Sequence, residues 1–236
     1  MLFSLLNQYR NGSAELEDLI IGALFSVIVI LLALCVHEAA HGYAAYKLGD
    51  PTARNLGRLT LDPTKHLDPF GALCMLLFGY GWAKPVPVNS RYFKKPRRDM
   101  AITAFAGPLS NLALAFVSTL FCMVLQRAWY NYLLKGESEF VFNLLYFAWL
   151  FFTYMHLLNI RLAIFNLIPI PPLDGSRILF LFLPDKYYFG LMKYERYISL
   201  LFIALLYMGV LSKPLDLASQ LISNGMFGLL SFIPGL

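Results

Sequence analysis

Three long apolar stretches, separated by polar segments, dominate the chain. The first runs from Leu19 to about Tyr46, the second from Met100 to Gln126, and the third from Phe140 to about Ile160. A helix needs roughly 20 apolar residues to cross the hydrocarbon core of a bilayer, so each stretch is long enough to span it. The pattern therefore predicts an all-α integral membrane protein with a core of three helices.

The remaining apolar segments are shorter. A further transmembrane helix is expected over about Ile198 to Ser212. The tail from Leu215 to Leu236 is apolar but dotted with polar residues, so whether it crosses the bilayer or lies on it stays open. The lead-in from Met1 to Asp18 is mildly acidic and shows no small-residue cleavage site, so the first helix is expected to be retained.

The connection from Lys47 to Arg98 holds ten of the 19 Lys and Arg residues of the chain. The positive-inside rule places such a connection in the cytoplasm and the N-terminus outside. Within it, Phe70 to Trp82 is uncharged but too short to span, which favours a re-entrant or interfacial segment. Leu56 to Leu61 and Val86 to Asn89 are expected to form short strands, the second confined to a sheet edge by its prolines.

The composition supports a membrane protein. Hydrophobic residues make up 58% and charged residues 14% of the chain, whereas soluble domains carry about 25% charged residues. The net charge of +5 comes largely from clusters beside apolar segments. The cluster Arg91 to Arg98 is therefore expected to meet anionic lipid headgroups, at about 1 kcal/mol per charge, and not nucleic acid. Cys35, Cys74 and Cys122 lack paired spacing and are expected to be buried thiols.

The strongest chemical signal is the H-E-x-x-H motif at the far end of the first stretch. His37 and His41 are four residues apart, so on a helix they share a face and can offer two imidazole nitrogens to one metal ion. Glu38 lies beside them and costs about 2.5–3.5 kcal/mol inside a membrane helix, so a functional role is expected. The alternative is a polar pair that is merely hydrogen-bonded within a helix bundle.

A second polar group returns to the same side of the membrane after the third stretch. The segment Asn166 to Asp174 has three prolines in four positions, so its backbone cannot be helical and must be buried or line a wet cavity. Asp174 is the favoured third metal ligand. His156 and His66 are the other candidates, expected to be a structural hydrogen-bonding residue and a solvated loop residue. Asn111 is interpreted as an amide that links helices.

Three motifs together resemble the site-2 protease family of intramembrane zinc metalloproteases. They are H-E-A-A-H-G in the first stretch, A-G-P-L-S-N in the second and F-N-L-I-P-I-P-P-L-D-G after the third. The resemblance covers roughly Leu19 to Ile178. It implies that Glu38 activates a water molecule and that Asn166 stabilises the oxyanion or holds the substrate backbone. It also implies one Zn²⁺ ion, with the ligands His37, His41 and Asp174.

The resemblance further implies a short membrane-associated hairpin between the first two core helices. Many relatives carry a PDZ or CBS domain, for which this sequence leaves no room, so the chain resembles the compact prokaryotic members. Residues 1–236 are expected to form one membrane-embedded protease domain, with a core at 19–178 and C-terminal helices at 179–236.

The expected function is hydrolysis of a peptide bond within or next to a transmembrane segment of another membrane protein. The site would face the cytoplasmic side of the cell membrane. The alternative is a non-catalytic zinc-binding protein that holds a partner helix, although such a protein would not need the base Glu38. A metal transporter would need more polar residues along its spans. The expected partners are a transmembrane substrate and the lipid bilayer, without nucleic acid, and a homo-oligomer stays open.

Overall fold

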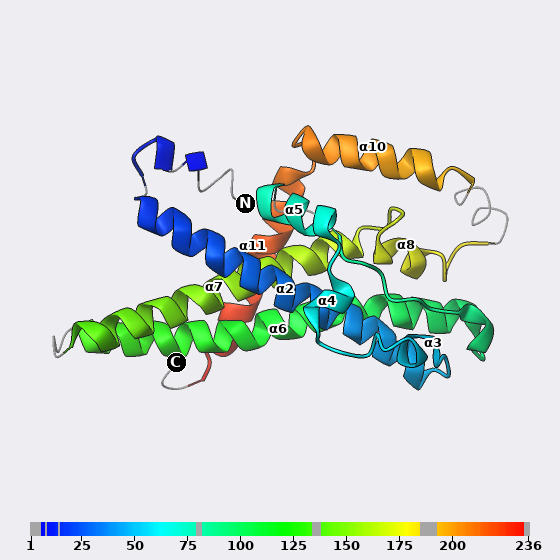
Figure 1. The fold of residues 1–236 in the computed structure, drawn as a ribbon, viewed down its shortest axis with the longest axis horizontal. Coiled ribbons are helices and arrows are strands. Elements are labelled where there is room, and N and C mark those ends of the chain that lie inside the picture. Colours follow the sequence, from blue (N-terminus) through cyan, green and yellow to red (C-terminus); the bar gives the residue numbers. More distant parts are fainter. Residues whose placement is uncertain are drawn as a thin grey trace.

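Three long helices organise the fold. The computed structural model describes residues 6–7, 9–13, 15–78, 82–133, 138–184 and 193–233. Helices α2 (Leu16–Lys47), α6 (Pro96–Leu133) and α7 (Glu139–Leu167) coincide with the three predicted stretches (Figure 1). Within the described residues, these three are the helices long and apolar enough to cross a membrane. The prediction of an all-helical membrane protein is confirmed.

Local sequence explains where α2 begins and ends. Glu15 and Asp18 form a capping box, in which the Glu15 N–H donates to the Asp18 carboxylate at 3.0 Å. At the other end Gly49 has a φ of 108°, and the N–H groups of Gly49 and Asp50 bond back to carbonyls in the last turn at 3.1 and 2.9 Å. This glycine turn ends the helix about 9 Å beyond His41.

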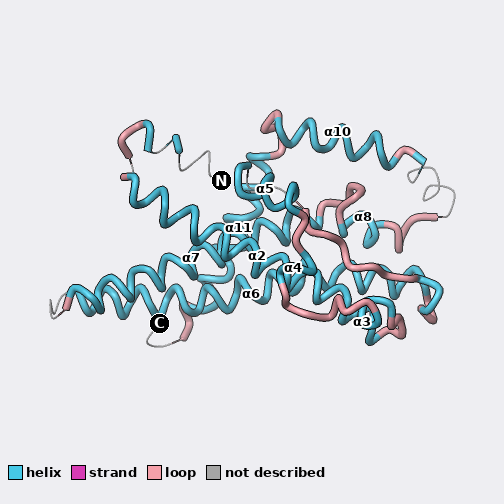
Figure 2. The backbone as a smooth tube through the Cα atoms, in the orientation of Figure 1, coloured by secondary structure: helices cyan, strands magenta, loops and turns pink. Residues whose placement is uncertain are grey.

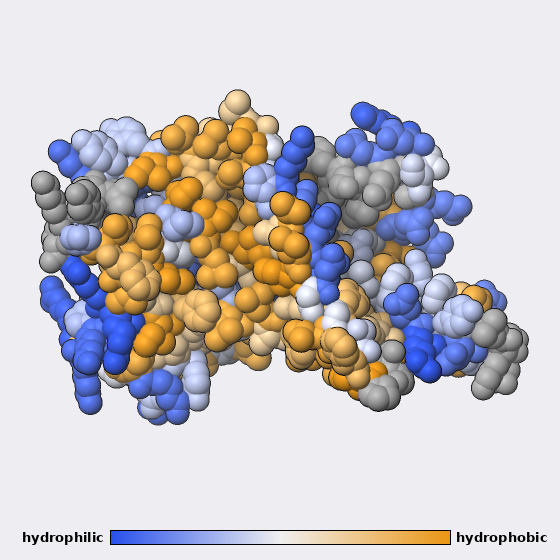
Figure 3. All heavy atoms as spheres, turned by 180° about the vertical axis from the view of Figure 1, so that it is seen from behind, coloured by the Kyte–Doolittle hydropathy of each residue, from blue (hydrophilic) through white to orange (hydrophobic). Residues whose placement is uncertain are grey.

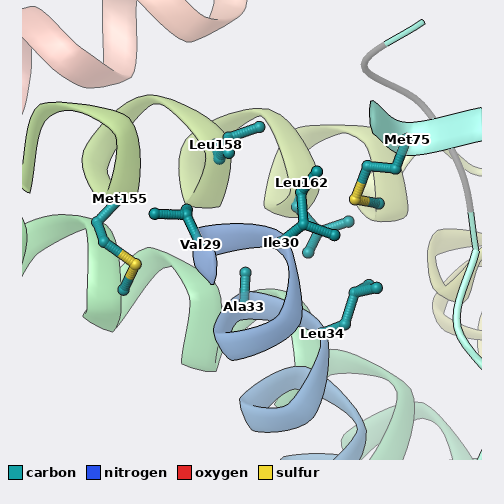
Figure 4. Close-up of a cluster of buried hydrophobic side chains, with 8 residues drawn as sticks. All are labelled: Val29, Ile30, Ala33, Leu34, Met75, Met155, Leu158 and Leu162. Atoms are coloured by element: carbon teal, nitrogen blue, oxygen red, sulfur yellow. The ribbon is translucent and has the colours of Figure 1, made fainter. Parts of the chain in front are cut away.

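Helices α6 and α7 lie side by side along most of their length, and α2 packs across both (Figures 1 and 2). Lipid tails are as apolar as leucine, so close packing has to hold these helices together in a bilayer. Figure 4 shows the contact, where side chains of α2 meet those of α7 and one methionine of the short helix α5. The buried cluster consists of Val29, Ile30, Ala33, Leu34, Met75, Met155, Leu158 and Leu162.

The surface matches a protein embedded in a bilayer. On the face shown in Figure 3, apolar side chains cover the middle, and hydrophilic side chains gather toward the two ends of the long axis. Large apolar residues on the long helices, such as Leu24, Phe105 and Leu144, are more than one-third exposed. Such exposure is expected where the neighbour is lipid.

The connection between α2 and α6 holds short helices. These are α3 (Thr52–Asn55), α4 (Pro63–His66), α5 (Pro69–Phe78) and the 3₁₀ helix η1 (Ser90–Tyr92). Helix α5 occupies most of the segment expected to be re-entrant, and residues 79–81 of that segment lie outside the described part. The two expected strands are wrong, because the described residues contain no strand (Figure 2). Residues 82–89, which we call the strap, are extended but do not pair with another strand.

Side chains from distant positions explain why the strap forms no sheet. The Val86 N–H donates to the Glu38 carboxylate at 2.7 Å, and the Asn89 N–H donates to the Asp50 carboxylate at 2.7 Å. The Arg58 guanidinium donates to two strap carbonyls at 2.7 and 3.2 Å. Side chains therefore already occupy the N–H groups of Val86 and Asn89 and the carbonyls of Lys84 and Pro85, and the Lys84 N–H bonds the His66 carbonyl at 2.9 Å.

The C-terminal third adds α8 (Asp174–Leu179), α10 (Glu195–Tyr207) and α11 (Ser212–Leu230). Helix α10 has 13 residues, fewer than a span needs, and Gly209 follows it with a φ of 75°. The further transmembrane helix expected there is not found in the part of the chain that the structure describes. Helix α11 packs against α7 and α6.

Candidate metal centre

Three polar side chains from two distant segments converge near the end of α2. His37 and His41 lie one turn apart with ring centroids 4.6 Å from each other. The proline-broken stretch after α7 leads back to them and begins α8 with Asp174. The two Nε2 atoms and the Asp174 Oδ2 form a triangle whose sides are each 3.1 Å. The structure thus brings together the three residues that the sequence predicted as metal ligands.

The other ring nitrogens determine where the histidine protons lie. The His41 Nδ1 is 2.7 Å from the Thr103 carbonyl oxygen, which can only accept, so this nitrogen carries the proton. The His37 Nδ1 is 2.5 Å from the Asn111 Oδ1, which likewise accepts. In neutral imidazoles the Nε2 atoms then present lone pairs. These lone pairs point toward each other and toward the Asp174 carboxylate.

This donor set fits a zinc ion. Three acceptors 3.1 Å apart, with no proton between them, repel one another unless a cation lies among them. Zinc binds nitrogen and oxygen at about 2.0–2.1 Å in a tetrahedron, which separates its ligand atoms by about 3.3 Å. Two histidines and one carboxylate also leave the fourth position for water or substrate, as catalytic zinc sites do. His37, His41 and Asp174 could therefore hold one metal ion.

Glu38 lies in the same cavity as the candidate ligands and is almost buried, with 8% of its surface exposed. One of its carboxylate oxygens, Oε2, accepts the Val86 N–H at 2.7 Å. The strap therefore holds Glu38 in an orientation next to the metal centre, through a donor that cannot titrate.

The cavity has a volume of about 350 Å³, within the range of ligand pockets. One wall is formed by α2, α6 and α7, a second by the strap, and a third by the segment that leads into α8. Its apolar lining comes chiefly from the strap and from α7. The residues are Leu34, His37, Glu38, His41, Trp82, Ala83, Pro85, Val86, Val88, Thr103, Leu162, Phe165, Asn166, Pro172, Leu173, Asp174 and Arg177.

Asn166 lines the cavity near the end of α7. Its Nδ2 donates to the Leu162 carbonyl at 3.0 Å, a bond within its own helix. An amide nitrogen has two protons, so the second remains to be given to a carbonyl in the cavity. Asn166 thus has the location and the donor for the role that the resemblance implies.

Helix α6 supplies a face that runs beside the two histidines. Thr103, Gly107 and Asn111 follow one another at intervals of four residues, which places them on one side of the helix. The first and last bond the two imidazoles. Between them, a Cβ on Gly107 would lie 2.7 Å from the His37 Cε1 and would also clash with the His41 ring. Glycine lets α6 approach close enough for these bonds.

The two other histidine candidates lie apart from the centre. His156 bonds Thr119 at 2.8 Å and Ser223 at 2.7 Å, so its expected structural role is confirmed. The expectation that His66 is a solvated loop residue is wrong. Its side chain is fully buried, and its Nε2 lies 2.8 Å from the Thr60 carbonyl, which keeps the loop folded.

Sequence reasoning missed the partners of the two imidazoles. The interpretation of Asn111 as an amide that links helices is confirmed, because it bonds Ala33 of α2 and Asn159 of α7. Its bond to His37 and the bond of His41 to the Thr103 carbonyl were not predicted. A signal for Asn111 was present, because it lies one turn after Gly107 and a small residue often marks a close helix approach. Every residue has a backbone carbonyl, so the residue type at position 103 gives no indication that its carbonyl bonds His41.

Comparisons with known proteins agree on one family. The model of Peptidase family M50 matches residues 25–208. The chain is 47% identical over 155 residues to "Putative zinc metalloprotease YwhC" of Bacillus subtilis, covering 66% of this chain and 67% of YwhC. It is 30% identical over 153 residues to Rip2 of Mycolicibacterium smegmatis, which is named in the same terms, covering 61% and 52%. The match thus spans about half of Rip2. No solved structure matches the chain.

Proposed function

The chain belongs to peptidase family M50, and from this premise we propose that it is an intramembrane zinc endopeptidase. It hydrolyses a peptide bond within or next to a transmembrane segment of another membrane protein. The observation that carries the proposal is the triangle of three acceptors, each 3.1 Å from the others, in a cavity shared with Glu38 at the end of a membrane helix.

His37, His41 and Asp174 hold one zinc ion, which when bound polarises the scissile carbonyl and lowers the pKa of a water molecule to about 7. Glu38 takes a proton from the attacking water as its oxygen adds to the carbonyl carbon. Glu38 then gives that proton to the leaving nitrogen as the carbon–nitrogen bond breaks. The products are a new carboxylate and a new amine.

Asn166 donates its second amide proton to the carbonyl oxygen on which negative charge develops, or to the neighbouring substrate backbone. One such donor is worth about 10²–10³ in rate in comparable sites. Its existing bond to the Leu162 carbonyl limits rotation of the amide, which reduces the entropy lost when substrate binds.

The substrate reaches this cavity as an extended chain. An intact helix uses its own carbonyls in internal hydrogen bonds, so the segment to be cut must first unwind. Val86 and Val88 of the strap line the cavity. Neither the N–H nor the C=O of Val88 has a hydrogen-bond partner among the described residues. These groups pair with the substrate backbone, although the strap forms no strand on its own.

The site lies toward the cytoplasmic leaflet, and the N-terminus lies outside. This orientation rests on the positively charged connection between α2 and α6, which the positive-inside rule places in the cytoplasm. The two histidines lie near the end of α2 that leads into this connection. With this orientation, the substrate is cut near the cytoplasmic end of its transmembrane segment.

The experiment replaces Glu38 by glutamine in the full chain and measures zinc content and cleavage of a model transmembrane substrate together. Glu38→Gln is expected to retain zinc and lose about 10²–10⁴-fold in cleavage rate, the usual share of a general base. Glu139→Gln, at the far end of α7, is the matched control and should cleave normally. A zinc-loaded Glu38→Gln protein that cleaves at the wild-type rate would refute the proposal. A wild-type protein that binds zinc without cleaving any substrate would favour a zinc-binding holder of partner helices.

A further inference from the structure

A chain of side-chain amides runs from the metal centre into the helix bundle. The Asn111 Oδ1 lies 2.5 Å from the His37 Nδ1. The Asn111 Nδ2 is 2.7 Å from the Asn159 Oδ1 and 3.2 Å from the Ala33 carbonyl. Both asparagines are fully buried. The amides therefore connect α2, α6 and α7 where no water competes for their bonds.

Both amide orientations follow from backbone groups. The Asn159 Nδ2 donates to the Met155 carbonyl at 2.8 Å, so its Oδ1 must face Asn111. Asn111 then donates to this oxygen and to the Ala33 carbonyl, which turns its own Oδ1 toward His37. An amide oxygen only accepts, so the His37 Nδ1 must be the donor. Two fixed carbonyls thus determine the position of one imidazole proton.

We propose that Asn111, held in place by Asn159, is a positioning residue that keeps the His37 proton on Nδ1 and its Nε2 lone pair toward the metal. The inference rests on the proposed zinc site and extends it to α7. A metal-bound histidine usually donates its other N–H to an acceptor, and loss of that acceptor costs about 10–100-fold in metal affinity. His41 has the Thr103 carbonyl for this purpose, whereas His37 depends on a side chain.

A purely structural amide would behave differently, and two substitutions separate the two roles. Asn111→Leu keeps the branched shape of the side chain but removes the acceptor. Asn111→Asp keeps the acceptor but adds a buried charge. If Asn111 only packs, leucine is tolerated better than aspartate, because an unpaired buried charge is costly. If Asn111 orients His37, aspartate is tolerated better, since carboxylates commonly accept the N–H of a zinc-bound histidine.

The experiment uses the full-length protein in detergent and measures zinc affinity by competition with a chelator, so it does not depend on substrate cleavage. Asn111→Leu should lose about 10–100-fold in affinity. Asn111→Asp should lie closer to wild type than to the leucine variant. Thr119→Val is the matched control, because it removes another buried hydrogen bond between α6 and α7 away from the metal, and it should keep wild-type affinity.

The second link is tested by Asn159→Leu, which leaves the Asn111 amide without its acceptor on α7. A loss smaller than that of Asn111→Leu is expected. Wild-type affinity in Asn111→Leu or in Asn159→Leu would overturn the inference. So would an aspartate variant that binds zinc no better than the leucine variant, or that fails to fold where leucine folds. A wild-type chain that binds no zinc would instead refute the proposed function.

Discussion

Asp174 reaches the metal centre by a route unlike that of the two histidines. His37 and His41 are fixed by the regular geometry of α2, whereas Asp174 follows a non-helical stretch and is the first residue of α8. Gly175 makes this approach feasible, because a Cβ there would lie 2.5 Å from the Ile168 carbonyl oxygen and would clash with the Leu167 carbonyl as well. The carboxylate is thus held by the turn itself.

The first prediction separates Asp174 from the other ligand candidates. Asp174→Ala should lose most of its zinc under mild chelation, because two imidazoles alone bind zinc weakly. His156→Ala and His66→Ala should keep theirs, since these rings bond Ser223 and the Thr60 carbonyl, away from the centre. The measurement is metal content after dialysis against a chelator. Loss of zinc from His156→Ala, with retention by Asp174→Ala, would show that the third ligand is misassigned.

The positions of the histidines and prolines in the sequence predict part of this site, whereas the hydrogen-bond partners of its side chains could not be predicted. The spacing of His37 and His41 requires a shared helix face, and the prolines before Asp174 require an irregular backbone. Both expectations agree with the structure. The partner of Asn111 could not be predicted, because an amide with two donor protons and one acceptor oxygen fits many neighbours until the helices are packed.

At the scale of elements, the approach of α6 to α2 determines how the two imidazoles are held. Gly107 has no side chain at the point where α6 passes the two rings, and Thr103 and Asn111 bond them on either side. The apolar patterns of α2 and α6 do not specify how closely the two helices approach each other. The absence of a side chain at Gly107 allows the short distance between α6 and the two rings.

The second prediction follows from this contact. In Gly107→Ala the new Cβ would clash with both rings, so α6 or the imidazoles must shift and zinc affinity should fall by at least the 10-fold typical of a disturbed ligand environment. Gly225→Ala on α11 is the matched control. Its Cβ meets nothing within 4 Å, and alanine favours a helix by about 1 kcal/mol. Equal zinc affinity in the two variants, measured by chelator competition, would contradict the close approach.

The strap shows where element prediction failed. Alternating prolines and β-branched residues suggested an edge strand, and the extended backbone was correctly anticipated. The pairing was not, because the N–H groups of Val86 and Asn89 bond the carboxylates of Glu38 and Asp50, which lie 48 and 39 residues earlier. Period-two patterns report backbone shape, and they do not report whether the hydrogen bonds go to another strand or to side chains.

At the scale of the whole molecule, the three long apolar helices of the described residues and the uneven distribution of charge predict how the protein lies in the membrane. With α2, α6 and α7 as the spans, the segment before α2 and the connection after α7 are expected on opposite sides. The positive-inside rule predicts that the basic connection between α2 and α6 lies on the cytoplasmic side. The apolar middle and hydrophilic ends of the face shown in Figure 3 are consistent with this arrangement.

The last prediction tests that arrangement with single cysteines in a background without Cys35, Cys74 and Cys122. Serines before α2, between α2 and α6, and before α7 are exposed, and cysteine closely matches them in size. They are Ser13, Ser90 and Ser138. In intact cells a membrane-impermeant maleimide should label the first and third but not Ser90→Cys, and permeabilised cells should show all three labelled. Because the two histidines lie near the end of α2 that leads to Ser90, labelling of Ser90→Cys alone in intact cells would move the metal centre to the outer leaflet. Labelling of both Ser13→Cys and Ser90→Cys would mean that α2 does not span the bilayer.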